Sequence, residues 1–259
     1  MRDVAKVLSL TAALLVVGCG SDDSNFNYGY YNPGGGNNPG VVAPVAVADS
    51  FSVLGGGTLT GSVTANDTVN GATVTAFQNP STSGGTVAIT GAGQLTYTPP
   101  TGQTNISDTF TYTLNNSAGS STATVTVAVG ARGFFVKNDV AATGTGSQAS
   151  PFKTLLEATT AAAGQSGAQI VVFRGDGTAT GQNVPVTLSA NQSIVAQDPA
   201  NQPVISGTVN LAGNSTLANL RLVGNTGTNA VVGTGFAGAT LANLTVANTT
   251  GSGVNMTNP

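Results

Sequence analysis

The 259-residue sequence predicts an all-β protein with two differently built halves, an antiparallel β-sandwich followed by coils of a parallel β-solenoid. Charged residues make up only 7% of the chain, and Gly, Thr, Val and Asn are abundant, which suits short strands joined by tight turns. Apolar and polar residues alternate between positions 45 and 129, as in half-buried strands. A five-residue segment recurs near the C-terminus at a spacing typical of one solenoid coil.

The first 24 residues predict export from the cytoplasm. Arg2 and Lys6 precede an apolar run, residues 7–17, that is too short to cross a bilayer as a helix. Small and polar residues follow this run, and the whole pattern is typical of a secretory signal peptide.

The segment Val16-Val17-Gly18-Cys19 resembles a bacterial lipobox, although its first position departs from the usual leucine. The resemblance implies that residues 1–18 are a lipoprotein signal peptide and that Cys19 is acylated, with palmitate-type chains. Two or more chains hold a protein stably on a membrane. Gly20 stands where an aspartate would signal inner-membrane retention, so the resemblance implies an outer-membrane lipoprotein at the cell surface. An ordinary signal peptide is the alternative.

Residues 19–44 form the lipidated cysteine and a predicted flexible tether. Glycine and asparagine dominate this stretch, and its prolines disfavour helices and central strands. We expect it to lift the folded part away from the lipid surface.

The composition excludes several function classes. The chain has no histidine and Cys19 is its only cysteine, which excludes histidine-dependent nucleophilic devices, disulfides and zinc clusters. The net charge is −3 with seven basic residues, so no nucleic-acid partner is expected. No cofactor is expected, except for the calcium ion considered below.

Residues 45–129 predict an antiparallel sandwich. Strand-like segments of alternating residues are separated by Gly, Asn and Pro clusters at intervals of about ten residues, and the length is enough for about seven strands. The clearest of these segments are Leu95–Thr98, Thr109–Leu114 and Ala123–Val129.

This part resembles the cadherin-like or Ig-like repeats of large bacterial surface proteins. The matching segments, in order, are Pro44–Phe51, Thr64–Asp67, Gly84–Val87, Leu95–Pro99, Ser107–Tyr112 and the strand ending at Val129. The resemblance implies a spacer or adhesive module rather than an enzyme.

Three acidic residues of the sandwich are candidate calcium ligands, because some cadherin-like modules bind calcium through clustered carboxylates. They are Asp49, Asp67 and Asp108. Calcium takes six to eight oxygen ligands, often with a bidentate glutamate, and this segment has no glutamate. The alternative is structural, with Asp67 closing a turn and Asp108 capping the start of a strand.

Residues 130–259 resemble the beginning of right-handed parallel β-helix proteins of the pectate-lyase-like group. The resemblance rests on Gly133–Asp139, Gly144–Ser147 and Ser150–Leu155. It implies a short helix that caps one end of the β-helix, for which the Ala-, Leu- and Glu-containing stretch 154–163 is suited, and a next strand at 169–173. The predicted fold is therefore an Ig-like sandwich followed by an incomplete right-handed parallel β-helix.

An internal repeat supports stacked coils. Thr216–Leu220 recurs as Thr240–Leu244, 24 residues later. Each coil cannot bury its apolar face alone, so neighbours stack, which places Asn219 above Asn243 in a predicted amide ladder. Leucine-rich repeats share this period, but the glycine-rich turns and the lack of a helical second half argue against them. The sequence stops without a second cap, so we expect a longer natural chain.

The acidic residues of this half are Asp139, Glu157, Asp176 and Asp198, and no two of them fall one coil apart to make a hydrolytic pair. Arg174-Gly175-Asp176 spells an integrin-binding tripeptide, which we interpret as a turn. The sequence favours a non-catalytic surface lipoprotein that displays a β-helix arm for adhesion or for binding glycans or another cell-surface component, with the membrane contacted through its lipid. The alternatives are an anchored polysaccharide lyase or glycoside hydrolase with catalytic coils beyond residue 259, and a structural subunit of a surface layer or matrix.

Overall fold

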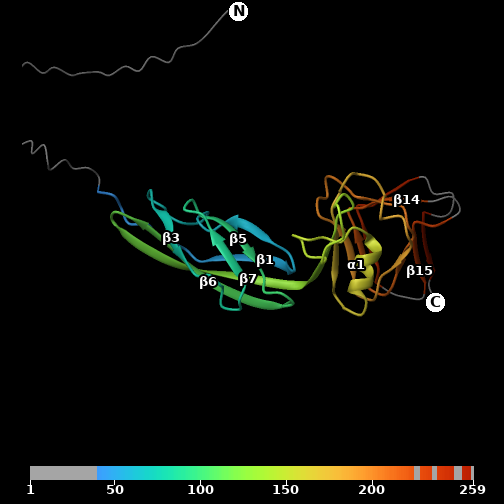
Figure 1. Ribbon diagram of the computed structural model, residues 1–259, viewed down its shortest axis with the longest axis horizontal. Coiled ribbons are helices and arrows are strands. Elements are labelled where there is room, and N and C mark those ends of the chain that lie inside the picture. Colours follow the sequence, from blue (N-terminus) through green and yellow to red (C-terminus); the bar gives the residue numbers. More distant parts are fainter. Residues whose placement is uncertain (1–39, 225–227, 235–237, 248–252, 258–259) are drawn as a thin grey trace, which may run out of the picture. The chain divides into compact units, whose positions relative to one another are not determined.

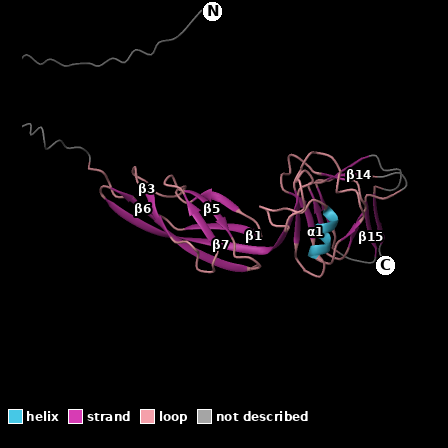
Figure 2. Ribbon diagram, in the orientation of Figure 1, coloured by secondary structure: helices cyan, strands magenta, loops and turns pink. Residues whose placement is uncertain are grey.

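The computed structural model describes residues 40–224, 228–234, 238–247 and 253–257, whose regular secondary structure consists of strands apart from one helix (Figures 1 and 2). Cys19, the predicted signal peptide and most of the predicted tether lie outside the described residues. In the part of the chain that the structure describes, no helix is long and apolar enough to span a membrane.

The N-terminal strands form a sandwich of two sheets. One sheet has the order β2-β5-β4, and the other has the order β3-β6-β7 with β1 added on the free side of β7. The strands are β1 (Asp49–Gly55), β2 (Leu59–Ser62), β3 (Thr73–Phe77), β4 (Thr86–Ile89), β5 (Gln94–Thr98), β6 (Ile106–Asn116) and β7 (Gly119–Val136).

Alternation along the strands builds the core between these two sheets. In β6, the residues that face the core are fully or almost fully buried, and among them are Phe110, Tyr112 and Leu114. Tyr97 from β5 stacks on Phe110 with ring centroids 6.0 Å apart. Each buried aromatic side chain removes a large apolar area from water, so these rings dominate the stability of the sandwich.

Strand β7 belongs to both halves of the chain. Its first part pairs antiparallel with β6 and parallel with β1, and its last four residues, Gly133–Val136, pair in parallel with β8 (Gln169–Val172). The strand thus runs without interruption through position 129, where the sequence places the end of the sandwich. Gly130 and Gly133 both lie inside this strand.

The remaining strands form three parallel sheets, which we call the three-sheet region. After the first coil, which has no strand in one of the three sheets, the chain visits the sheets in a constant order, and strands of successive coils pair in parallel. The three sets are β8, β10 (Ser193–Ala196), β13 (Thr216–Ala218) and β16 (Thr240–Ala242); then β11 (Val204–Ile205), β14 (Arg221–Val223) and β17 (Thr245–Ala247); then β9 (Val186–Thr187), β12 (Val209–Leu211), β15 (Val231–Thr234) and β18 (Val254–Thr257).

Like residues stack in register from coil to coil. Ile170 pairs with Ile194, Ile194 with Leu217, and Leu217 with Leu241. The first three side chains are fully buried, whereas Leu241 in the last described coil is 37% exposed. The repeat found in the sequence therefore corresponds to pairing of β13 with β16.

Helix α1 (Leu155–Ala162) covers the first coil of the three-sheet region (Figure 1). Thr154 is its N-cap: the Thr154 hydroxyl accepts from the Glu157 backbone N–H, and the Glu157 carboxylate accepts from the Thr154 N–H. This capping box satisfies donors that the first helical turn would leave unpaired. Leu155, Ala158 and Ala162 are fully buried in the same core as the coils.

Candidate functional site

Two of the three candidate calcium ligands lie near one tyrosine of the sandwich. The Tyr112 hydroxyl is 2.8 Å from Asp67 Oδ2, and the Val47 N–H donates to Asp67 Oδ1 at 2.7 Å. Asp49 is buried, and among the described residues its Oδ2 has no hydrogen-bond partner. Burial, and then the negative charge of nearby Asp67, raise the pKa of Asp49 to about 6.

Asp108 is held in a separate place. It lies four residues before Tyr112 on β6, which is about 13 Å along a strand. It accepts hydrogen bonds from the Ser81 hydroxyl, from the Tyr97 hydroxyl at 2.6 Å, and from the backbone N–H groups of Ser83 and Thr109, each at 2.8 Å. Burial by itself raises the pKa of Asp108, but these donors outweigh it and hold the pKa below its ordinary value.

The three carboxylates therefore do not converge. Asp108 fastens the segment around Ser81 to β5 and β6, and Asp67 fastens the loop before β3 to the N-terminal segment. In the described ranges, no group of three or more His, Cys, Asp or Glu residues is arranged to hold a metal ion. Both Asp67 and Asp108 have structural partners, but the Asp67 carboxylate binds the distant Val47 N–H rather than a neighbour in its own turn, and Asp108 lies inside β6.

The two asparagines of the predicted ladder are hydrogen bonded. Asn243 Nδ2 donates to Asn219 Oδ1 at 2.8 Å, and both residues have positive φ, 48° and 60°. Asparagine tolerates this left-handed backbone better than most other residues with a side chain. The two asparagines therefore allow the left-handed backbone of the turns and also form a hydrogen bond between the coils.

A second ladder was not predicted from the sequence. Asn214 Nδ2 donates to Asn191 Oδ1 at 3.1 Å, and Asn191 Nδ2 donates to Ser166 Oγ at 3.1 Å. Both asparagines have positive φ and stand two residues before register partners, Ser193 and Thr216. The signal was available in the paired segments Asn191-Gln192-Ser193 and Asn214-Ser215-Thr216, each followed by a buried aliphatic residue.

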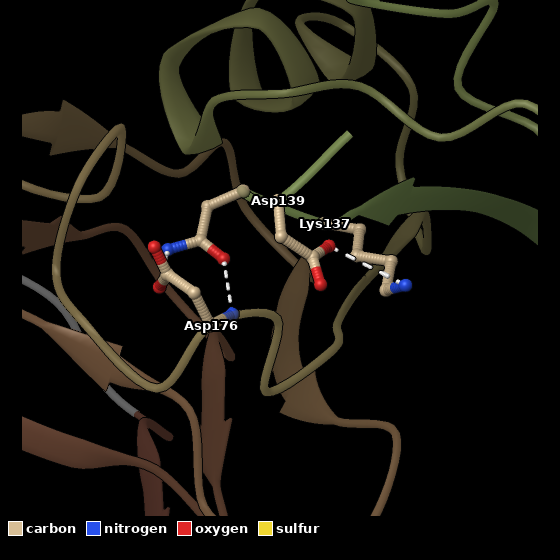
Figure 3. Close-up of polar contacts among 4 residues, drawn as sticks. Lys137, Asp139 and Asp176 are labelled. Carbon is tan, nitrogen blue, oxygen red and sulfur yellow. Dashed lines mark hydrogen bonds and ion pairs between the residues drawn. The ribbon is translucent and has the colours of Figure 1, made fainter. Parts of the chain in front are cut away.

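The described carboxylates of the three-sheet region each have a structural partner. Asp139 forms an ion pair with Lys137 at 3.3 Å, and Asp176 Oδ1 accepts from Asn138 Nδ2 at 2.7 Å (Figure 3). Asp176 Oδ1 also accepts from the Thr178 N–H at 2.8 Å. The pKa of Asp176 is lowered by its hydrogen bonds with Thr178 and then Asn138.

Gly175, in the middle of the Arg-Gly-Asp tripeptide, has a φ of +58°, and a Cβ there would lie 1.7 Å from Asn138 Oδ1. The Asp176 N–H donates to that same oxygen at 3.1 Å. The tripeptide is thus a tight turn locked against the preceding coil, and it leaves the Arg174 side chain exposed.

Two arginines line an open polar hollow of about 550 Å³ beside β11, β14 and β17, which we call the two-arginine hollow. Its polar lining includes Arg174, Asn201, Gln202, Arg221, Asn243 and Thr245. The sequence did not point to this grouping, because Arg174 and Arg221 are far apart in the chain and only the coiling brings them to one surface.

The amide side chains around this hollow are held in place. Arg174 Nη1 donates to Asn201 Oδ1 at 3.2 Å, and Asn201 Nδ2 donates to Asp198 Oδ2 at 2.7 Å. Gln202 Nε2 donates to the Asn243 carbonyl at 2.8 Å, and its Oε1 accepts from the Thr245 hydroxyl at 3.0 Å. Three coils are linked in this way, so the polar surface is pre-arranged.

Residues 41–128 match the family model of the bacterial Ig domain, which confirms the Ig-like part of the prediction. A search of the curated proteins finds no match. Among solved structures, the chain is similar to a 2,6-sialyltransferase of Vibrionaceae Photobacterium sp. JT-ISH-224, crystallised in a ternary complex with the donor product CMP and the acceptor substrate lactose. That likeness has 13% sequence identity and a TM-score of 0.28 and covers 67% of this chain and 42% of the other, and at this TM-score it carries no argument.

Proposed function

We propose that the chain is a cell-surface lipoprotein anchored to the outer membrane through Cys19, in which the Ig-like module carries a non-catalytic β-helix arm for adhesion or glycan binding. The match of residues 41–128 to the bacterial Ig domain is the observation that carries this proposal. A bacterial Ig domain suggests a surface or adhesive role, and a lipobox-like segment precedes this one.

The proposed arm is a right-handed parallel β-helix. Three parallel sheets, visited in a constant order after the first coil, support this proposal, because parallel crossover connections are right-handed in about 98% of cases. The stacked Asn, Thr and Ser side chains on its outer surface offer repeated amides and hydroxyls. These groups suit many weak contacts with the hydroxyls of a glycan.

We propose that the arm is not catalytic, because each of its described carboxylates has a structural partner. Asp139 is paired with Lys137, Glu157 caps α1, and Asp176 and Asp198 hold turns. A carboxylate that acts as a general acid or base must instead be free to exchange a proton with substrate.

The anchor and the location are tested in cells of a bacterium that expresses the full chain. We expect incorporation of labelled palmitate into the wild type and none into Cys19→Ser. Protease added to intact cells should then digest the wild-type protein, while a periplasmic marker survives. Protection from protease until the outer membrane is opened would contradict surface display.

The non-catalytic part of the proposal is tested separately by incubation of the purified protein with a panel of polysaccharides. Release of unsaturated or reducing ends would contradict it.

A further inference from the structure

We propose that a pocket between the sandwich and the loop that joins β7 to α1 binds a small organic carboxylate with an apolar body, with Arg132 as its anion-binding residue. We call it the junction pocket. One wall includes Gly56 and Pro100 of the sandwich, the other includes Thr145 and Ala149 of the loop, and the volume is about 330 Å³. Small-molecule sites have volumes of roughly 300–1,000 Å³ and often form where two domains meet. This ligand is separate from the proposed glycan.

The two walls of the junction pocket are fastened to each other by Gln148. The Gln148 N–H donates to the Gly56 carbonyl at 3.0 Å, and the Thr58 N–H donates to Gln148 Oε1 at 2.8 Å. The loop that carries Gln148 is also tied to β7, because the Phe135 N–H donates to the Gly146 carbonyl at 2.9 Å. A site whose walls are already fixed loses little conformational entropy when it is filled, which favours the binding of a small ligand.

The head group of Arg132 lies at the wall of this pocket. A Cβ built at Gly56 would lie 3.6 Å from Arg132 Cζ and Nη1, so the guanidinium faces that glycine. The side chain is half-buried, and its Cζ lies 5.4 Å from the centre of the Phe134 ring. The ring attracts the cation but does not neutralise its charge.

The positive charge of Arg132 is not offset by its surroundings. In the part of the chain that the structure describes, its guanidinium has neither a carboxylate at ion-pair distance nor a hydrogen-bond acceptor. The residues that line the junction pocket include no acid, and the same holds for the neighbouring hollow that Arg132 shares with Phe134 and Gln165. An anion in the pocket would therefore meet a donor that is unpaired and already partly removed from water.

The lining of the junction pocket favours a carboxylate on an apolar body. A guanidinium donates two parallel N–H groups to the two oxygens of a carboxylate, and a single cation matches a single negative charge. Pro99, Pro100 and Ala149 present apolar side chains to the pocket, so a ligand ring or alkyl group packed against them would leave water. The hydroxyls of Thr58 and Thr145, on opposite walls, can add hydrogen bonds to the head group.

The test is isothermal titration calorimetry of the full chain, purified in detergent, with the detergent solution alone as the blank. The probes are benzoate, benzamide and acetate. We expect benzoate to bind about tenfold more tightly than benzamide, which lacks the charge, and than acetate, which lacks the ring. Arg132→Gln should weaken benzoate binding by about tenfold, and Ala149→Leu should weaken it as much by filling the pocket.

Arg174→Gln is the matched control, because it removes one positive charge outside the junction pocket, and it should bind benzoate like the wild type. Thermal melting by circular dichroism checks that every variant is folded. Equal benzoate binding by folded Arg132→Gln and the wild type would overturn Arg132 as the anion-binding residue. Unchanged binding by folded Ala149→Leu would overturn the pocket as the site.

The probes separate the two parts of the ligand. Equal affinity for benzoate and benzamide would overturn the carboxylate, and equal affinity for benzoate and acetate would overturn the apolar body. Failure to bind benzoate would overturn the whole inference. None of these outcomes affects the proposed surface display, which is judged by the palmitate and protease experiments.

Discussion

Asn243 donates a side-chain hydrogen bond of 2.8 Å to Asn219, its counterpart one coil earlier, and both residues hold left-handed backbone. The pair joins turn conformation to coil stacking. Substitution can separate the two contributions, because glycine keeps the backbone preference while it removes the amide.

We expect Asn219→Ala to lower the free energy of unfolding by about 2 kcal/mol, since it loses both the left-handed tolerance and the hydrogen bond. Asn219→Gly should cost about half as much, because only the hydrogen bond is lost. Urea denaturation monitored by circular dichroism measures both. Equal losses for the two variants would show that the backbone conformation contributes nothing.

Asp108 should stabilise the sandwich through its charge. It is fully buried and accepts four hydrogen bonds. Asp108→Asn turns an acceptor oxygen into a donor facing other donors, so we expect a loss of about 2–4 kcal/mol at pH 7. Asp139→Asn, a surface change, should have little effect and serves as the control.

The pH dependence of Asp108 follows from its lowered pKa. In the unfolded chain the carboxyl titrates near its ordinary value, so the stabilisation is complete above that value. It is lost as the pH falls through the lower pKa of the folded state. Urea titrations from pH 6 down to pH 2 should show the wild type losing its advantage over Asp108→Asn.

The contribution of Asp49 to stability should depend on pH with the opposite sign to that of Asp108. Its pKa in the folded protein is raised to about 6, so folding favours the protonated form. Its stabilising effect is complete below the ordinary pKa near 3.8 and is lost as the pH rises through 6, which amounts to at most about 3 kcal/mol. Asp49→Asn should therefore stabilise the protein at pH 8 and have little effect at pH 4. Destabilisation at pH 8 would show that the ionised carboxylate has a favourable partner.

Gly175→Ala should unfold the turn after β8. The new Cβ meets Asn138 Oδ1 at 1.7 Å as well as the strain of a positive φ. Gly164→Ala is the matched control, because its φ is +75° but nothing lies within 4 Å of the new atom. We expect Gly164→Ala to lower the free energy of unfolding by about 1 kcal/mol, and Gly175→Ala to lower it by about 1–3 kcal/mol more. The same loss for both variants would mean that Asn138 moves aside freely.

The sequence predicts elements well where one physical cause acts alone. Alternation over 109–114 and 123–129 marks β6 and β7, and the stretch 154–163, where the family resemblance implies a capping helix, contains α1. The roles of residues that depend on partners far away in the chain could not be predicted in this way. Nothing near Asp49 in the sequence indicates that burial and the charge of Asp67 together raise the pKa of its carboxyl group.

The sequence analysis missed the equivalence of the four turns before β8, β10, β13 and β16 for a different reason. Gly167, Asn191, Asn214 and Gly238 occupy equivalent places and all have positive φ, but two are glycines and two are asparagines. Conformation, rather than residue identity, is what repeats. The two-arginine hollow was hidden in the same way, since its residues come from separate coils.

The parallel pairing of β1 with β7 has a mechanical consequence. β1 is the first strand of the sandwich and β7 the last, and they run side by side from Asp49–Val125 to Val53–Val129. Tension between the N-terminal segment and the three-sheet region would pull these strands in opposite directions along their length. Their hydrogen bonds would be loaded in shear and would have to break together rather than one at a time. The paired strands would therefore resist a force applied between the N-terminal segment and the three-sheet region.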